Sequence, residues 1–168
     1  ITYEGKKMGK SLGNAIDLKG FFSGDHPLLE QAYSPMTIRF FMLQAHYRST
    51  LDFSNEALQG AEKALKRMGE ALMRLDQLDP SGKAVLLNEE HEHNLVTFLD
   101  DVKRELNDDF NTAKAIARMF EAMPVINSLA QHSDKGFAVR PETFAQFREA
   151  FKAVFFDVLG MKTESEAA

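Results

Sequence analysis

One stretch in the middle of the chain repeats apolar side chains every three or four residues for about 20 residues. The positions are Leu58, Ala61, Leu65, Met68, Leu72 and Leu75. This spacing puts all of these side chains on one face of an α-helix, and leaving such a face in water is unfavourable. The helix must therefore pack against other helices, so we expect the chain to build a helical bundle around it.

Four further segments show the same helical period, and each begins with a residue type that favours a helix start. They start at Ser34-Pro35, Asn88, Asn111 or Thr112, and Pro141, while Ser54 can cap the central helix. Their apolar faces comprise Ile38, Phe41, Met42 and Ala45; Leu95, Phe98, Leu99, Val102 and Leu106; Ile116, Met119, Phe120, Met123 and Ile126; and Phe144, Phe147, Phe151, Val154, Phe155 and Val158.

The pattern predicts a mainly α fold, an antiparallel bundle of four to five helices over residues 34–160. The first helix should reach about Tyr47. Pro124 should kink its helix or end it early, because proline lacks an N–H. Residues 1–33 should form an irregular loop and connecting segment, and residues 161–168 a polar tail.

Composition narrows the possible functions. The net charge is −5, which argues against a globally basic nucleic-acid binder. The 168 residues include no cysteine, which excludes disulfides and thiolate metal sites within them. No apolar run approaches the roughly 20 residues that a membrane-spanning helix needs. We therefore expect a cytoplasmic protein without a membrane segment, and a monomer.

The irregular N-terminal segment contains the stretch G-K-K-M-G-K-S at residues 5–11. It resembles a phosphate-binding P-loop, but it has one residue too few between the two glycines. A solvated basic turn is a simpler explanation for three lysines so close together. A third interpretation comes from residues 7–14, which we call the lysine loop.

The lysine loop, K-M-G-K-S-L-G-N, resembles the KMSKS signature of class I aminoacyl-tRNA synthetases, with Gly9 in place of a serine. Residues 39–49 resemble the R-x-F-L-L-S-A-H-Y-R-S run of the cysteinyl-tRNA synthetases, and residues 51–54 resemble the L-N-F-S step that follows it. Residues 107–113 resemble that family's D-D-D-F-N-T-P segment. Because these segments occur in family order, the resemblance to cysteinyl-tRNA synthetases covers about residues 1–130.

The resemblance implies an enzyme that activates cysteine with ATP and Mg and transfers it to the 3′ end of tRNA(Cys). Lys7 and Lys10 match the two lysines of the signature and would act catalytically on the phosphates. The implied ATP-binding residues are Lys7, Met8, Gly9, Lys10 and Ser11. Gly9 leaves the order of the closed loop open, because glycine adds backbone freedom. The family's zinc site uses cysteine ligands, so the resemblance places it outside this chain.

The helical part resembles the DALR domain of the same family, whose short motif falls on residues 36–39. Arg39, His46, Tyr47 and Arg48 are candidates for contacts with tRNA or with the catalytic domain. The alternative for His46 and Arg48 is that they satisfy carbonyls at the end of their helix.

Two other polar groups invite a metal or general-base hypothesis. Asp108 and Asp109 precede the fourth helix, and we expect them to form its negatively charged cap. His91 and His93 are two residues apart on a helix and point in different directions, so we expect them to face solvent and bind no metal.

The resemblance further implies that the missing N-terminal catalytic domain carries the H-x-G-H motif and the cysteine site. The 168 residues should be inactive alone. Two alternatives stay open: the related ligase that joins cysteine to an amino sugar, and a non-catalytic RNA-binding or scaffold bundle.

Overall fold

The computed structural model describes residues 1–163, and its chain divides into two compact units. Residues 1–66 and the described residues after Gly160 form the first unit, and Arg67–Gly160 form the second. Of the predicted tail, residues 161–168, the part from residue 164 onward lies outside the described residues. The predicted boundary at residue 34 stays a prediction. Each unit is built around its own apolar core.

The first unit contains a small sheet that the sequence did not predict. Its strands are β1 (Thr2–Tyr3), β2 (Lys6–Lys7) and β3 (Asp52–Phe53), in the order β2-β1-β3. Strand β1 pairs antiparallel with β2 and parallel with β3. Around it lie a 3₁₀ turn, η1 (Lys10–Leu12), and two helices, α1 (Leu18–Ser23) and α2 (Pro35–Leu43). The N-terminal segment is therefore folded onto a strand that lies 50 residues further along the chain.

The core of this unit is aromatic. It comprises Tyr3, Ile16, Phe21, Tyr33, Ile38, Phe53 and Leu58, with Met8 and Phe41 among the partly buried side chains packed against it. Asn55, at the start of α3 (Asn55–Gln77), ties three segments together. Its amide donates to the Leu28 carbonyl at 2.7 Å and to the Tyr3 hydroxyl at 3.1 Å, and its Oδ1 accepts from the Tyr33 hydroxyl at 3.0 Å.

Helix α2 differs from its prediction at its end and at one position of its apolar face. It begins as expected, because the Ser34 hydroxyl accepts the Thr37 N–H, but it ends at Leu43 rather than near Tyr47. Phe40 is fully buried, whereas Met42, predicted to face inward, is exposed. Ile38 lies in the core and Phe41 packs against it, so the predicted face is correct except at Met42.

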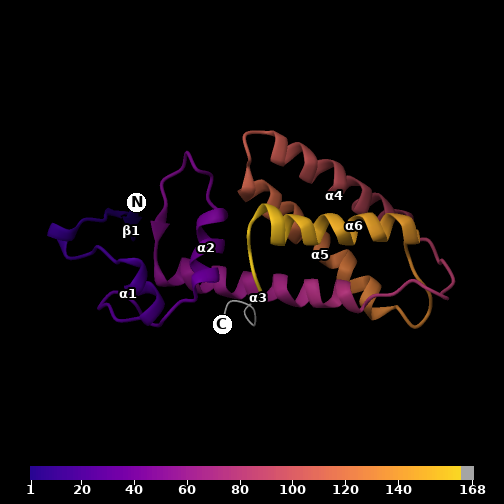
Figure 1. The fold of residues 1–168 in the computed structure, drawn as a ribbon, viewed down its shortest axis with the longest axis horizontal. Helices are drawn as coiled ribbons and strands as arrows, with labels where there is room; N and C mark the ends of the chain where they lie inside the picture. Colours follow the sequence, from indigo (N-terminus) through magenta and orange to yellow (C-terminus); the bar gives the residue numbers. More distant parts are fainter. Residues whose placement is uncertain (164–168) are drawn as a thin grey trace. The chain divides into compact units, whose positions relative to one another are not determined.

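The second unit contains the C-terminal part of α3 with α4 (Glu89–Asn107), α5 (Thr112–Gln131) and α6 (Pro141–Ala153), which continues as a π-helical turn over Val154–Val158 (Figure 1). All six apolar side chains of the predicted α3 seam are buried. The N-caps Asn88 and Asn111 each accept a backbone N–H, as predicted. Helix α5 continues through Pro124, so it does not end early there, and the alternative of a kink stays a prediction.

Contacts between helices fix their directions. His91 of α4 lies against Ser128 of α5, and Asp101 lies against Arg118, so these two helices run antiparallel. In the same way Asp76 of α3 binds Lys152 of α6 at 2.7 Å, while Arg148 binds the Leu78 carbonyl at 3.1 Å. The Arg67–Phe120 and Arg74–Asn127 contacts make α3 parallel to α5. Successive helices therefore alternate in direction, which confirms the predicted antiparallel bundle.

Candidate functional site

The lysine loop follows a tight hairpin. Strands β1 and β2 are joined by Glu4 and Gly5, whose φ angles of 48° and 76° are both positive. Positive φ at both central residues is the signature of a type I′ turn, and glycine favours it at the second position. The Asp52 carboxylate of β3 accepts the Gly5 N–H at 2.9 Å and the Thr2 hydroxyl at 2.6 Å. These two hydrogen bonds lower the pKa of Asp52 and hold the hairpin against the third strand.

Backbone hydrogen bonds hold the lysine loop near both of its ends. The Met8 N–H donates to the Ile1 carbonyl at 3.3 Å, and the Met8 side chain packs against the core. The η1 turn then runs over Lys10–Leu12 and ends at Gly13, whose φ is 69° and whose N–H donates to the Lys10 carbonyl. The loop is thus anchored at its start and turned back at its end.

Asn14 follows this turn, and its side chain bonds to backbone groups that precede the turn. Its Oδ1 accepts the Gly9 N–H at 2.9 Å, and its Nδ2 donates to the Lys7 carbonyl at 3.0 Å. The sequence alone does not indicate that Asn14 is a site residue. The available signal was an asparagine directly after the glycine that ends a turn, because asparagine side chains commonly bind nearby backbone groups.

Lys7, Lys10 and Ser11 are exposed on this ordered backbone. Lys6 and Lys7 are neighbours on β2, so their side chains leave opposite faces of the strand. Gly9 has a φ of −162°, an extended conformation that any residue adopts. A Cβ at Gly9 would lie 3.6 Å from the nearest atom of Leu12, an ordinary contact. A serine therefore fits at this position, and the loop does not depend on glycine there.

His46, Tyr47 and Arg48 lie in the turn after α2. The His46 and Tyr47 rings stack with centroids 4.7 Å apart, and the Arg48 guanidinium lies 5.3 Å from the centre of the Tyr47 ring. The Arg48 N–H donates to His46 Nδ1 at 3.2 Å. Tyr47 is 65% exposed, and the fourth candidate, Arg39, is exposed on α2 itself. The structure therefore gathers three of the four candidates into one aromatic and cationic stack.

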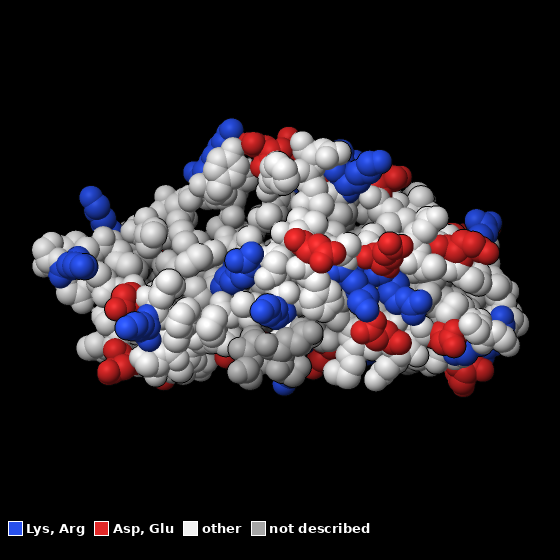
Figure 2. Space-filling view, viewed as in Figure 1, with Lys and Arg blue, Asp and Glu red and all other residues white. Residues whose placement is uncertain are grey.

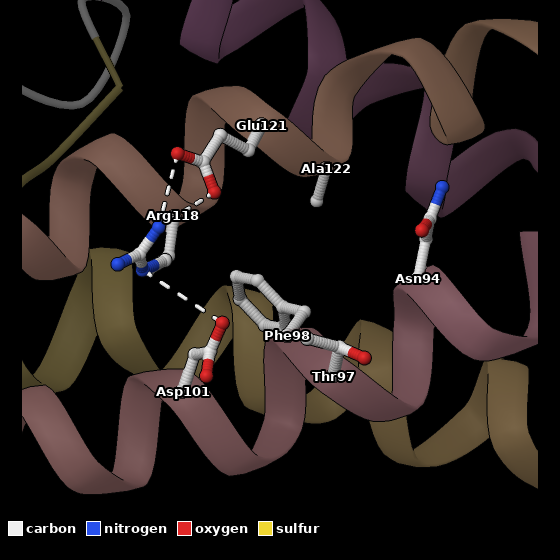
Figure 3. A pocket seen from close by; sticks show the side chains of 7 residues that line it. All are labelled: Asn94, Thr97, Phe98, Asp101, Arg118, Glu121 and Ala122. Carbon is white, nitrogen blue, oxygen red and sulfur yellow. Dashed lines mark hydrogen bonds and ion pairs between the residues drawn. The ribbon is translucent and has the colours of Figure 1, made fainter.

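A pocket in the second unit lies between α4 and α5 (Figure 3). It is lined by Asn94, Thr97, Phe98, Asp101, Arg118, Glu121 and Ala122. Arg118 donates to both carboxylate oxygens of Glu121, at 2.9 and 3.0 Å, and its Nε lies 3.8 Å from Asp101. The hydrogen bonds to Glu121 raise the pKa of Arg118. Because acidic neighbours offset its charge, Arg118 is a weak candidate for binding an anionic ligand.

Of the acidic and histidine candidates, Asp108, Asp109 and His91 differ from their predictions. Asn111 caps α5, whereas Asp108 ends α4 and Asp109 adopts a φ of 60°, so the prediction of an acidic cap is wrong. His91 Nε2 lies 3.0 Å from the Ser128 hydroxyl, so it packs between helices instead of facing solvent. His93 is exposed, as expected. Within residues 1–163 no group of three His, Asp or Glu side chains is arranged to bind a metal ion.

Charge is mixed on the visible surface. In Figure 2 the blue basic and red acidic side chains of the second unit are interspersed on the face shown. No helix in the described part of the chain is long and apolar enough to cross a membrane.

Comparison with known families assigns both parts of the chain to one class of protein. Residues 1–63 match the family described as "tRNA synthetases class I (C) catalytic domain", and residues 101–163 match the "DALR domain". The first match contains the lysine loop with the β-hairpin, and the second contains the C-terminal end of α4 together with α5 and α6. The chain is therefore a segment of a class I aminoacyl-tRNA synthetase.

Similarity to individual proteins narrows this class. The chain is 47% identical to a cysteine–tRNA ligase of Parabacteroides distasonis over 168 residues, and 45% identical to that of Bacteroides thetaiotaomicron over 164 residues. It is 34% identical to the cysteine–tRNA ligase of Chlorobium luteolum. These alignments cover 98–100% of this chain but 30–32% of each relative. The chain therefore belongs to the cysteinyl-tRNA synthetase family, which confirms the resemblance predicted from the sequence. It spans about a third of the length of the curated relatives it matches.

Proposed function

We propose that this chain supplies the phosphate-facing loop and a tRNA-facing part of a cysteine–tRNA ligase. The observation that carries the proposal is the lysine loop, in which two exposed lysines stand on a hydrogen-bonded backbone within the segment matched by the synthetase catalytic family. In the complete enzyme, cysteine and ATP would meet at a site completed by a catalytic domain outside these residues. Mg²⁺ would arrive with ATP, and the zinc ligands would lie outside this chain.

In the reaction, the carboxylate of cysteine attacks the α-phosphorus of ATP, and the bond to the β-phosphate breaks to release pyrophosphate. Negative charge grows on the leaving phosphates as that bond breaks. The ammonium groups of Lys7 and Lys10 stabilise this charge more strongly than they stabilise bound ATP, and this difference accelerates the step. The tRNA ribose hydroxyl then attacks the cysteinyl carbonyl and displaces AMP.

The stack of His46, Tyr47 and Arg48 is the proposed contact with tRNA or with the catalytic domain. Its exposed tyrosine and cationic neighbour suit a nucleic-acid surface, because bases stack on aromatic rings and arginine binds phosphate. We further propose that the complete enzyme is a cytoplasmic monomer.

The test uses the full-length ligase with Lys10→Ala, assayed by cysteine-dependent ATP–pyrophosphate exchange. Loss of one such group should lower kcat by about 10²–10³-fold. Lys6→Ala is the matched control, because it removes an equal charge from an exposed position on β2 that the signature does not include, and it should leave kcat unchanged.

The chemistry of the acceptor separates the remaining alternatives. The activated cysteine should transfer to tRNA(Cys), and transfer to an amino sugar instead would identify the related ligase. The 168-residue chain alone should catalyse no exchange. Equal activity of the Lys10→Ala and wild-type enzymes would refute the role proposed for the loop.

A further inference from the structure

We propose that Asn14 is a positioning residue for the lysine loop: its side-chain amide holds the backbone that sets Lys7 and Lys10 relative to one another. This inference rests on the proposed function of the loop. Asn14 would touch no substrate, and it would act only through the two lysines.

Both ends of the Asn14 amide are used. The Oδ1 accepts the N–H of Gly9, the residue directly before Lys10, and the Nδ2 donates to the carbonyl of Lys7 itself. The amide is thus bonded to the chain at both sides of Met8. Since one bond needs an acceptor and the other a donor, the amide has a single orientation here.

No other side chain can replace this arrangement. Aspartate has the same shape but no donor for the Lys7 carbonyl, and its second oxygen would face that carbonyl and repel it. Glutamine has both groups, but its extra methylene moves them away from the two backbone partners. Gly13 contributes by turning the chain back at a φ of 69°, which brings Asn14 under the loop.

The consequence for catalysis follows from preorganisation. Fixed charges stabilise a transition state because they need no rearrangement when the reaction occurs. If the backbone between the lysines is released, each ammonium group samples more positions, and the favourable geometry must be recovered in every turnover. The loss should therefore fall mainly on kcat, with a smaller change in the KM for ATP.

The first measurement tests the bridge in the 168-residue chain. Amide hydrogen exchange at Gly9, followed by NMR, should be slow in the wild type and at least tenfold faster in Asn14→Ala. Asn14→Asp keeps the Gly9 acceptor and should give an intermediate rate. If Asn14→Ala fails to fold, Asn14→Asp alone carries the comparison. Unchanged exchange in the folded variants would overturn the proposal, because the bridge would then not order the loop.

The second measurement tests the role in the full-length ligase. Asn14→Ala should lower kcat for pyrophosphate exchange by about tenfold to a hundredfold, as small misplacements of reacting groups do. Thr2→Val is the matched control, because it removes one hydrogen bond from the adjacent hairpin and leaves the loop bridge intact. This control should retain the wild-type kcat.

Two outcomes would overturn the inference while leaving the proposed function in place. Faster exchange at Gly9 with wild-type kcat and KM would make Asn14 purely structural. An equal loss of kcat in Thr2→Val would indicate general destabilisation. Failure of the proposed function itself would be recognised separately, because Lys10→Ala would then also be fully active.

Discussion

Glu92 is a buried charged residue whose replacement should destabilise the bundle. It belongs to the first turn of α4, but the residue is only 8% exposed and its carboxylate caps a different helix. It accepts the Arg140 N–H at 2.9 Å and the Thr143 hydroxyl, and both partners belong to the N-terminus of α6. Arg140 is the N-cap residue of α6 and provides no side-chain cap. Glu92 thus satisfies a helix end that the helix itself leaves open.

The size of the effect follows from these contacts. A hydrogen bond to a charged acceptor contributes about 1.5–3 kcal/mol, and Glu92→Ala removes two of them. The half-buried Thr143 can turn its hydroxyl toward water, which offsets part of the loss. We expect the free energy of unfolding to fall by about 3 kcal/mol, and the thermal midpoint by roughly 6–12 °C.

Thermal unfolding followed by far-ultraviolet circular dichroism measures this change. The matched control is Glu90→Ala, which removes the same charge from the same turn of α4 at an exposed position and should change stability by less than about 0.5 kcal/mol. In a Thr143→Val background, Glu92→Ala should cost less than it does alone, because one of its bonds is already missing. Equal midpoints for Glu92→Ala and Glu90→Ala would refute the argument.

Two further predictions concern the first unit. Gly9→Ser should leave the thermal midpoint within about 2 °C of wild type, since the backbone is extended and the added atoms fit; a large loss would show that the loop does require glycine. Burial raises the pKa of Tyr3 and Tyr33 above the ordinary 10.0, so the unfolded chain loses these protons first as the pH rises. The stability they provide is present below pH 10 and should be lost as the pH passes through their raised pKa values. Absorbance titration of tyrosinate should follow this loss, and replacing both tyrosines with phenylalanine should remove it.

The bundle could be predicted from the sequence because its signals are local and repeated. The α3 seam extends over many turns, so no single substitution hides the period, and every predicted position is buried. The caps Ser34, Ser54, Asn88 and Asn111 were also predictable, since each accepts an N–H only three residues further on. Long helices carry this information many times over.

The first unit could not be predicted to the same depth. Its strands have two residues each, too few to show an alternating pattern, and β3 lies far from the strand it pairs with. The face of α2 also depended on packing, which the pattern of a nine-residue helix does not determine. Non-local pairing, rather than propensity, decides the structure here.

The candidate site was predicted as residue types but not as an arrangement. The motif indicated Lys7 and Lys10, yet the bridge made by Asn14 depends on the fold of a turn that has no periodic pattern. The sequence offered both an acidic cap at Asp108 and Asp109 and a helix start at Asn111, and the chain uses Asn111 after two left-handed residues. A preference for a residue type cannot decide between neighbours that all satisfy it.

The parallel pairing of β1 with β3 also sets the order of events during synthesis. The hairpin that carries the lysine loop leaves the ribosome before β3, because the carboxylate that holds its turn lies 50 residues later. At about 5–20 residues per second, the hairpin waits roughly 3–10 s for its third strand. Two-stranded hairpins are marginally stable in water, so during that interval the nascent chain would carry the loop without its native register. The loop becomes a fixed element only after α2 and β3 have been made, so this segment is ordered well after it is synthesised.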